Sequence, residues 1–246
     1  MLPNASWFVA PSNFWGRLSD HSRTGLSALG NDLRFKKGSP IFRAGSTGEH
    51  VYVLTGGRVK IYALSPLGRA VILWFCLPGE IFGLAEMARG SERMVYAEAC
   101  TDVEVLVIPR ERFRAFLESD AATAMLVVDM LSCRLRGLTD TVLNLIADDV
   151  TTRVVKLLVR LSQRYGVPLD NGSRLLEIPL THQEIADMIG TTRQSVSGVI
   201  NDLKQQGLLT VSEHRIRLRD DRCLETLLTR SLPPLSGVVA QTAVVR

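Results

Sequence analysis

The fold of this chain is decided by residues 181–203, which read Thr-His-Gln-Glu-Ile-Ala-Asp-Met-Ile-Gly-Thr-Thr-Arg-Gln-Ser-Val-Ser-Gly-Val-Ile-Asn-Asp-Leu. Thr181 can cap a helix with its hydroxyl, and Glu184 stands three positions on, so the pair forms a capping box. Ala186 is small where two helices must cross, and Gly190 permits a left-handed turn. Apolar residues then recur at helical spacing, at Val196, Val199, Ile200 and Leu203. The stretch predicts a helix-turn-helix.

The polar face of the second helix is left to Arg193, Gln194 and Ser197. Arginine forks onto guanine, glutamine pairs with adenine, and serine donates or accepts, so these side chains are suited to base edges. The pattern therefore predicts DNA binding. An ordinary helical hairpin with a polar face is the alternative interpretation.

Two short runs rich in β-forming residues follow the helix-turn-helix. Gly207 is placed to end the second helix, and the runs 208–212 and 215–219 meet at Glu213 and His214. This order predicts a winged helix. Arg215, Arg217 and Arg219 alternate along the last run, which suits contact with phosphates and equally suits a solvated strand edge.

Composition limits the class of protein. With 246 residues and 46% hydrophobic content the chain is long enough for two domains, and its net charge of +4 is compatible with nucleic acid. No run of eighteen apolar residues or secretory leader is present, so we expect a cytoplasmic protein without membrane association. The four cysteines are scattered and the four histidines are dispersed, which predicts no metal site and no iron–sulfur cluster and argues against a cupin-type metal enzyme; the cysteines are Cys76, Cys100, Cys133 and Cys223.

Upstream of the helix-turn-helix, short strands broken by glycine turns run from residue 34 to residue 108. Their even spacing predicts a small antiparallel barrel or jelly roll. Residues 82–90 are expected to form one short helix inserted between two strands.

Residues after Pro109 lack turn signals for some forty positions. Apolar residues recur there at spacings of four, three, four and three, which is a coiled-coil rhythm: Leu131, Leu135, Leu138, Val142 and Leu145. A narrow apolar seam favours pairing with a second copy of the chain over packing on its own barrel.

These elements define an α+β fold with an N-terminal antiparallel β-barrel, a long dimerisation helix and a C-terminal winged helix-turn-helix. Asp148 and Asp149 can start a helix over 150–165, so a hinge is expected near Ala147, and 166–173 is expected to be a loop. The expected divisions are an N-terminal segment 1–32, an effector-binding barrel 33–109, a dimerisation helix 110–147, a DNA-binding domain 148–221 and a tail 222–246.

Barrel, long helix and winged helix in this order resemble the CRP/FNR family of bacterial transcription regulators. The resemblance rests on Gly45, Gly57, residues 78–83, Glu92-Arg93, Asn144-Leu145, residues 149–153 and residues 181–203. It implies a cyclic-nucleotide-binding-like barrel and a homodimer that binds a palindromic operator in double-stranded DNA. An effector in the barrel would switch the dimer, which would contact RNA polymerase. The resemblance also places Thr181, His182, Gln183 and Thr192 near DNA, and Gly198 where a second base-reading arginine is usual.

The effector is approached through the same resemblance. Cyclic AMP is disfavoured, because Leu84 and Met94 replace the residues that would bind its ribose hydroxyl and phosphate, although Glu86 can shift toward the vacancy. Two guanidiniums, those of Arg93 and Arg134, favour a small dianion. The remaining residues expected around this effector are Ala85 and Thr139.

Other interpretations stay open at this point. Arg93 or Arg134 can instead pair with Glu86, Glu92 or Glu98. A haem held through His21 or His50 would make the protein a gas or redox sensor of the same family. A third alternative is a protein-interaction module whose winged helix does not bind DNA.

Overall fold

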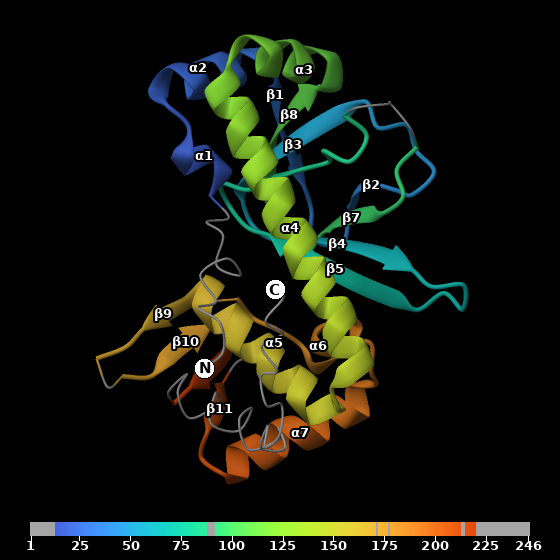
Figure 1. The fold of residues 1–246 in the computed structure, drawn as a ribbon, viewed down its shortest axis with the longest axis vertical. Helices are drawn as coiled ribbons and strands as arrows, with labels where there is room; N and C mark the ends of the chain where they lie inside the picture. The colour runs from blue at the N-terminus through green and yellow to red at the C-terminus, as the bar shows by residue number, and fades with distance from the viewer. Residues whose placement is uncertain (1–12, 88–91, 171, 177, 213–214, 220–246) are drawn as a thin grey trace, which may run out of the picture.

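The computed structural model describes residues 13–87, 92–170, 172–176, 178–212 and 215–219. A β-barrel stands at one end and a winged helix at the other, and the long helix α4 (Ala121–Ala147) runs from the first to the second (Figure 1). Within the described ranges, no helix is long and apolar enough to cross a lipid bilayer. The architecture is the α+β arrangement that the sequence predicts.

The barrel consists of two four-stranded antiparallel sheets, with orders β1-β8-β3-β6 and β2-β7-β4-β5. Its strands are β1 (Asn31–Phe35), β2 (Pro40–Phe42), β3 (His50–Gly56), β4 (Val59–Leu64), β5 (Ala70–Cys76), β6 (Ile81–Phe82), β7 (Tyr96–Ala99) and β8 (Val103–Pro109).

The central strands β3 and β8 are apolar on both faces. Along β3, Val51 and Val53 join the cluster under the helices, while Tyr52 and Leu54 join the barrel interior. Because side chains alternate across a strand, one apolar run can supply two cores. This sheet is therefore a wall between the barrel interior and the N-terminal helical layer.

Four helices form that layer, namely α1 (Phe14–Arg17), α2 (Asp20–Leu29), α3 (Arg110–Ser119) and the first half of α4. The expected single helix over 110–147 is divided into α3 and α4. Asp120 separates them in a non-helical conformation and caps α4 by accepting a hydrogen bond from the Thr123 backbone N–H at 3.0 Å. Only α4 continues beyond the barrel.

The prediction of a helix over residues 82–90 is wrong for the part of this range that the structure describes. Phe82 ends β6, and residues 85–87 form a turn in which the Met87 N–H donates to the Leu84 carbonyl at 3.1 Å. Phe82, the first residue of the expected helix, pairs with Tyr52 of β3 and therefore belongs to the sheet. Residues 88–90 lie outside the described ranges.

The C-terminal domain consists of three helices and a small sheet of order β11-β12-β10-β9. Its elements are α5 (Val150–Tyr165), β9 (Gly166–Pro168), β10 (Arg174–Leu176), α6 (His182–Ile189), α7 (Arg193–Gln205), β11 (Leu209–Ser212) and β12 (Arg215–Leu218). Part of the loop expected over 166–173 is strand β9, because Val167 pairs with Leu175. The wing tip at Glu213 and His214 and the tail 222–246 lie outside the described residues.

The two domains share one apolar cluster. Ile72 and Phe75 of β5 are 4% and 2% exposed and belong to the same cluster as the buried side chains of α5, α6 and α7. Arg58 adds a polar connection, donating to the Pro179 carbonyl at 2.7 Å and to Glu184 Oε1 at 2.9 Å. The C-terminal domain therefore packs directly on strand β5 of the barrel.

Candidate nucleic-acid interface and effector site

The helix-turn-helix is formed by local interactions that the sequence predicts. Thr181 Oγ1 accepts from the Glu184 N–H at 3.1 Å, and Glu184 Oε2 accepts from the Thr181 N–H at 2.8 Å, which completes the capping box of α6. Gly190 takes φ +65° at the turn, and Ala186 is fully buried. Thr192 then caps α7 by accepting from the Ser195 N–H at 3.1 Å. These contacts fix the angle at which α7 leaves the turn.

The N-terminal end of α7 presents polar side chains to solvent. Arg193 and Gln194 are exposed, whereas Val196, on the opposite face, is fully buried. A helix N-terminus favours negative charge, and exposed arginine and glutamine suit base edges. Gly198 is exposed on the same helix, and a Cβ there would meet no atom within 4 Å.

Two expected DNA contacts also bind each other within the protein. The Ser197 hydroxyl lies 2.8 Å from His182 Nδ1 and 2.9 Å from the Arg193 carbonyl, which braces α6 against α7. Gln183 is exposed and donates to Asp187 Oδ1 at 2.7 Å, one turn along α6. Their roles toward DNA stay predictions.

Strand β12 has one basic and one apolar face. Arg215 and Arg217 are exposed, while Ile216 and Leu218 are 2% and 0% exposed. Arg219 is also exposed and pairs its N–H with the Leu208 carbonyl at 3.0 Å. The alternation expected from the sequence is present.

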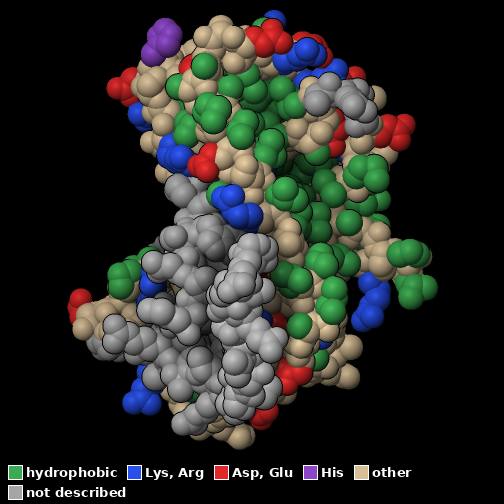
Figure 2. Space-filling view, in the orientation of Figure 1, with side chains coloured by type: hydrophobic (Ala, Val, Ile, Leu, Met, Phe, Trp, Pro, Cys, Tyr) green, Lys and Arg blue, Asp and Glu red, His purple; other side chains and the backbone are tan. Residues whose placement is uncertain are grey.

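The long helix exposes a row of large apolar side chains, called here the α4 stripe (Figure 2). Leu131, Leu135, Val142 and Leu145, which the heptad spacing identifies, are 42–66% exposed. The stripe also includes residues that the heptad count misses, namely Met125, Val128, Leu143 and Ile146. Leu138, the remaining heptad position, is half-buried and also lines a pocket beside α4, so its place in a dimer contact stays a prediction.

The expected effector residues do not gather at one place. Arg93 is 2% exposed, pairs with Glu86, donates to the His50 carbonyl and stacks 4.2 Å from the centre of the Phe42 ring. Around it the barrel interior is filled by aromatic rings, with Tyr52 and Phe82 stacked at 5.1 Å. Of the two interpretations of Arg93 that the sequence leaves open, the structure has the ion pair with Glu86.

Apart from Glu86, the other expected effector residues form no ion pair or hydrogen bond with Arg93 among the described residues. Leu84 is buried in the layer under the helices, whereas Ala85 and Thr139 are exposed and Met94 is 81% exposed. The family motif identifies these positions but does not indicate the direction in which each side chain points. His21 is exposed on α2 and His50 is half-buried at the start of β3.

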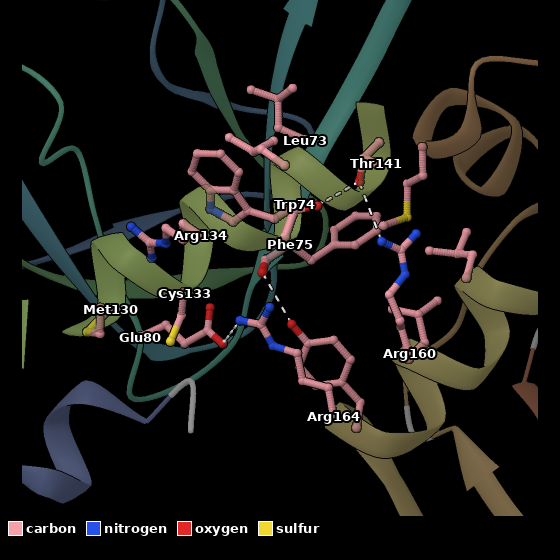
Figure 3. Close-up of a pocket in the computed structure, with 16 residues that line it drawn as sticks. Leu73, Trp74, Phe75, Glu80, Met130, Cys133, Arg134, Thr141, Arg160 and Arg164 are labelled. Atoms are coloured by element: carbon pink, nitrogen blue, oxygen red, sulfur yellow. Dashed lines mark hydrogen bonds and ion pairs between the residues drawn. The ribbon is translucent and has the colours of Figure 1, made fainter. Parts of the chain in front are cut away.

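Arg134 extends in a different direction and lines a pocket between the domains (Figure 3). Its guanidinium donates to the Ile81 carbonyl and lies 5.2 Å from the Trp74 ring. The pocket has a volume of about 150 Å³, and its wall includes Arg134 but not Arg93. The sequence-based expectation that the guanidiniums of Arg93 and Arg134 converge on one cavity is therefore wrong.

Three charged residues of this pocket were missed by sequence reasoning. Arg160 and Arg164 stand one turn apart on α5, and Glu80 follows the Pro78-Gly79 turn. Glu80 is 1% exposed and accepts from Arg164 at 2.7 Å. The i, i+4 spacing of the two arginines, which continues a row begun by Arg153 and Lys156 on the same side of α5, is the signal that could have found them.

Burial controls the protonation of several groups near the pocket. Burial lowers the pKa of Arg160 and raises the pKa of Asp140. The opposite charges of these two residues partly offset both shifts. Burial also raises the pKa of the Cys76 thiol to about 12. These groups therefore lie in a medium that strengthens interactions with an added charge.

Comparisons with known proteins agree with the geometry. Residues 32–120 match the cyclic nucleotide-binding domain family, and residues 152–227 match the Crp-like helix-turn-helix domain family. The nitrogen fixation regulation protein FixK of Azorhizobium caulinodans is 31% identical over 228 residues, covering 88% of this chain and 90% of the relative. A CRP-like cAMP-activated global transcriptional regulator of Mycobacterium tuberculosis is 27% identical over 202 residues, covering 81% and 90%.

Among solved structures, that of FixK2 from Bradyrhizobium japonicum superposes with a TM-score of 0.71 and 27% sequence identity, covering 81% of this chain and 97% of the other. The chain belongs to the CRP/FNR family of transcriptional regulators. It is a DNA-binding regulator and not an enzyme.

Proposed function

We propose that two copies of this chain associate through the α4 stripe and bind a two-fold-symmetric operator, with one helix-turn-helix in each half-site. The stripe carries this proposal, because its side chains are 42–79% exposed. Burying one large apolar side chain contributes about 1.5–3 kcal/mol, so a second copy that covers the stripe gains considerably. A two-fold contact covers both stripes at once.

We further infer how each copy binds DNA. Helix α7 enters the major groove with Arg193 and Gln194 at base edges, and the arginines of β12 lie along phosphates. The N-terminus of α6, with Thr181, His182 and Gln183, and the α7 cap Thr192 approach the backbone. The bound dimer contacts RNA polymerase, which we infer from family membership alone; transcription in vitro from the bound promoter with purified polymerase tests this contact.

Cyclic AMP is not the effector in this proposal, although the mycobacterial relative is described as cAMP-activated. Arg93, the residue expected to meet its phosphate, is paired with Glu86, and Leu84 is buried among apolar side chains. Titration of the protein with cyclic AMP should leave operator affinity unchanged.

Footprinting on the protein's own upstream DNA, together with sedimentation velocity, tests the function. We expect a dimer that protects two inverted half-sites centred roughly 34 Å apart. Protection of one half-site, or a protein that sediments as a monomer, would contradict the dimer. Binding to upstream DNA no tighter than to random DNA would favour the protein-interaction alternative.

A further inference from the structure

The pocket between the domains is formed by four elements that belong to different parts of the molecule. Strand β5 contributes Trp74 and Phe75, α4 contributes Arg134 and Thr141, and α5 contributes Arg160. Met188 of α6 completes the wall. A molecule seated here would touch the barrel, the dimer helix and the helix-turn-helix together (Figure 3).

The charge in this pocket is unbalanced. Three arginines line it with one carboxylate, and Glu80 is already paired with Arg164. Arg134 already donates to the Ile81 carbonyl, and its guanidinium lies over the Trp74 ring. Arg160 has one hydrogen bond within the described part of the chain, a long one of 3.5 Å to Thr141 Oγ1.

Arg160 is therefore the arginine of this pocket that is best placed to bind an anionic ligand. Asp140 and Asp148 are near enough to interact with it electrostatically, but neither forms an ion pair with it among the described residues. Burial of this guanidinium disfavours its charge, so an anion placed against it would be strongly stabilised.

The rest of the wall is apolar. Trp74, Phe75, Leu138, Leu161 and Met188 surround the charged groups. A cavity of about 150 Å³ accommodates a molecule the size of benzene. The wall thus suits a small molecule with an apolar body and one anionic group.

We propose that this pocket binds a small monocarboxylic acid, aromatic or short aliphatic, with its carboxylate on Arg160 and its body against Trp74, Phe75 and Leu161. The ligand fixes the placement of α6 relative to β5 and α4, and so alters operator affinity. This second step rests on the proposed function, whereas the binding itself does not. A ligand shifts a conformational equilibrium by its difference in affinity for the two states.

Binding is tested by calorimetry on the full chain without DNA, using benzoate, hexanoate and benzamide as probes. We expect benzoate and hexanoate to bind one per chain. Benzamide has nearly the same shape as benzoate but no charge, so we expect it to bind at least about tenfold more weakly.

Two variants assign the site. Arg160→Gln should weaken benzoate binding at least about tenfold. Gly137→Leu should abolish it by filling the pocket, since Gly137 lines the wall and a Cβ there meets no atom within 4 Å. Arg136→Gln is the matched control, because Arg136 is exposed on α4 and absent from the wall. It should bind benzoate like the wild type.

Three outcomes would overturn the inference: neither carboxylate binds, benzamide binds as tightly as benzoate, or Gly137→Leu binds benzoate normally. Adding operator DNA tests the coupling, for which we expect a change in operator affinity of about fivefold or more on saturation with benzoate. Saturation without such a change would overturn the regulatory step. A protein that binds benzoate but no operator would contradict the proposed function and leave the pocket assignment intact.

Discussion

At the scale of single residues, Arg193 has the most specific expected role. Its exposed guanidinium at the start of α7 can form a bidentate contact with guanine. Arg193→Ala should therefore lower discrimination between operator and random DNA by about 1–3 kcal/mol, measured by competition binding. Arg217→Ala is the control, because a phosphate contact should weaken binding to both DNAs alike. Equal weakening by Arg193→Ala would make Arg193 a phosphate contact too.

Gly198 is a position where the structure tolerates a larger side chain. Gly198→Ala should raise the free energy of unfolding by about 0.5–1 kcal/mol, because glycine in a helix interior is less stable than alanine and the new Cβ meets nothing within 4 Å. Urea denaturation measures this. Gly57→Ala should do the reverse, since Gly57 has φ +85° and a Cβ would overlap the Asp102 carbonyl. Destabilisation by Gly198→Ala would contradict the exposed placement of that face.

The residues that sequence reasoning places well are those whose partners are local. Thr181 and Glu184 are three positions apart, so their capping box is visible in the sequence. Glu86 and Arg93 are also near each other in sequence, but both were equally compatible with a ligand or with an ion pair. The choice depends on the aromatic rings of β2, β3 and β6 around them, which the local sequence does not report.

At the scale of elements, the α4 stripe should hold the dimer together. Replacing Leu135 and Val142 by glutamate should abolish the dimer in sedimentation velocity, because each would bury an unpaired charge at the contact. Operator affinity should fall when the dimer is lost, since the two helix-turn-helix domains of a dimer bind the two half-sites together. Leu33→Glu is the control, as Leu33 is 48% exposed on β1, away from the stripe. A double variant that still sediments as a dimer would exclude the stripe as the interface.

The break between α3 and α4 should be sensitive to acid. Hydrogen bonds from the Ser22 hydroxyl and the Thr123 backbone lower the pKa of Asp120 below its usual value. Its contribution to stability is therefore present above the pKa of the unfolded chain and is lost as pH falls through the folded value. Asp120→Asn should be less stable than wild type near pH 7, and the difference should shrink below about pH 4.

Urea midpoints measured between pH 7 and pH 3 follow this difference. Asp20→Asn, at a side chain that is 97% exposed on α2, controls for removal of a charge nearby. A difference between Asp120→Asn and wild type that stays constant with pH would show that the cap does not depend on its charge.

Elements with strong periodicity could be predicted from the sequence, and short ones could not. The apolar runs of β3 and β8 and the spacing in α6 and α7 indicate their structures directly. Strand β9 has three residues and exists because β10 pairs with it, so only the distant partner identifies it. The turn at residues 85–87 has helix-forming residues, but β6 takes up the residues before it.

At the scale of the whole molecule, Arg58 should couple the two domains. Its side chain is 10% exposed, contacts Glu184 and Pro179, and lies 4.7 Å from the centre of the Phe75 ring. Arg58→Ala should weaken the domain contact by about 2–5 kcal/mol, because Glu184 would keep a buried charge without its partner. Scanning calorimetry should then resolve two transitions, whereas we expect one for the wild type because the domains share an apolar cluster.

Arg34→Ala is the control for this variant, since Arg34 of β1 pairs with Glu104 of the neighbouring barrel strand β8 at 2.9 Å. It should keep the single transition. One transition in Arg58→Ala as well would mean that Ile72 and Phe75 alone couple the domains. The contact joins residues 126 positions apart, so nothing in the sequence around either residue indicates it.

The contrast between the cysteines gives the molecule a natural labelling position. Burial keeps the Cys76 thiol protonated and raises the pKa of Cys100 as well, so neither reacts readily with an alkylating reagent. Cys133 is half-buried on α4 and lines the interdomain pocket. With Cys223, outside the described residues, replaced by serine, a nitroxide attached at Cys133 would occupy one place in each protomer. The separation of the two spins would then report, in solution, how far apart the paired long helices lie.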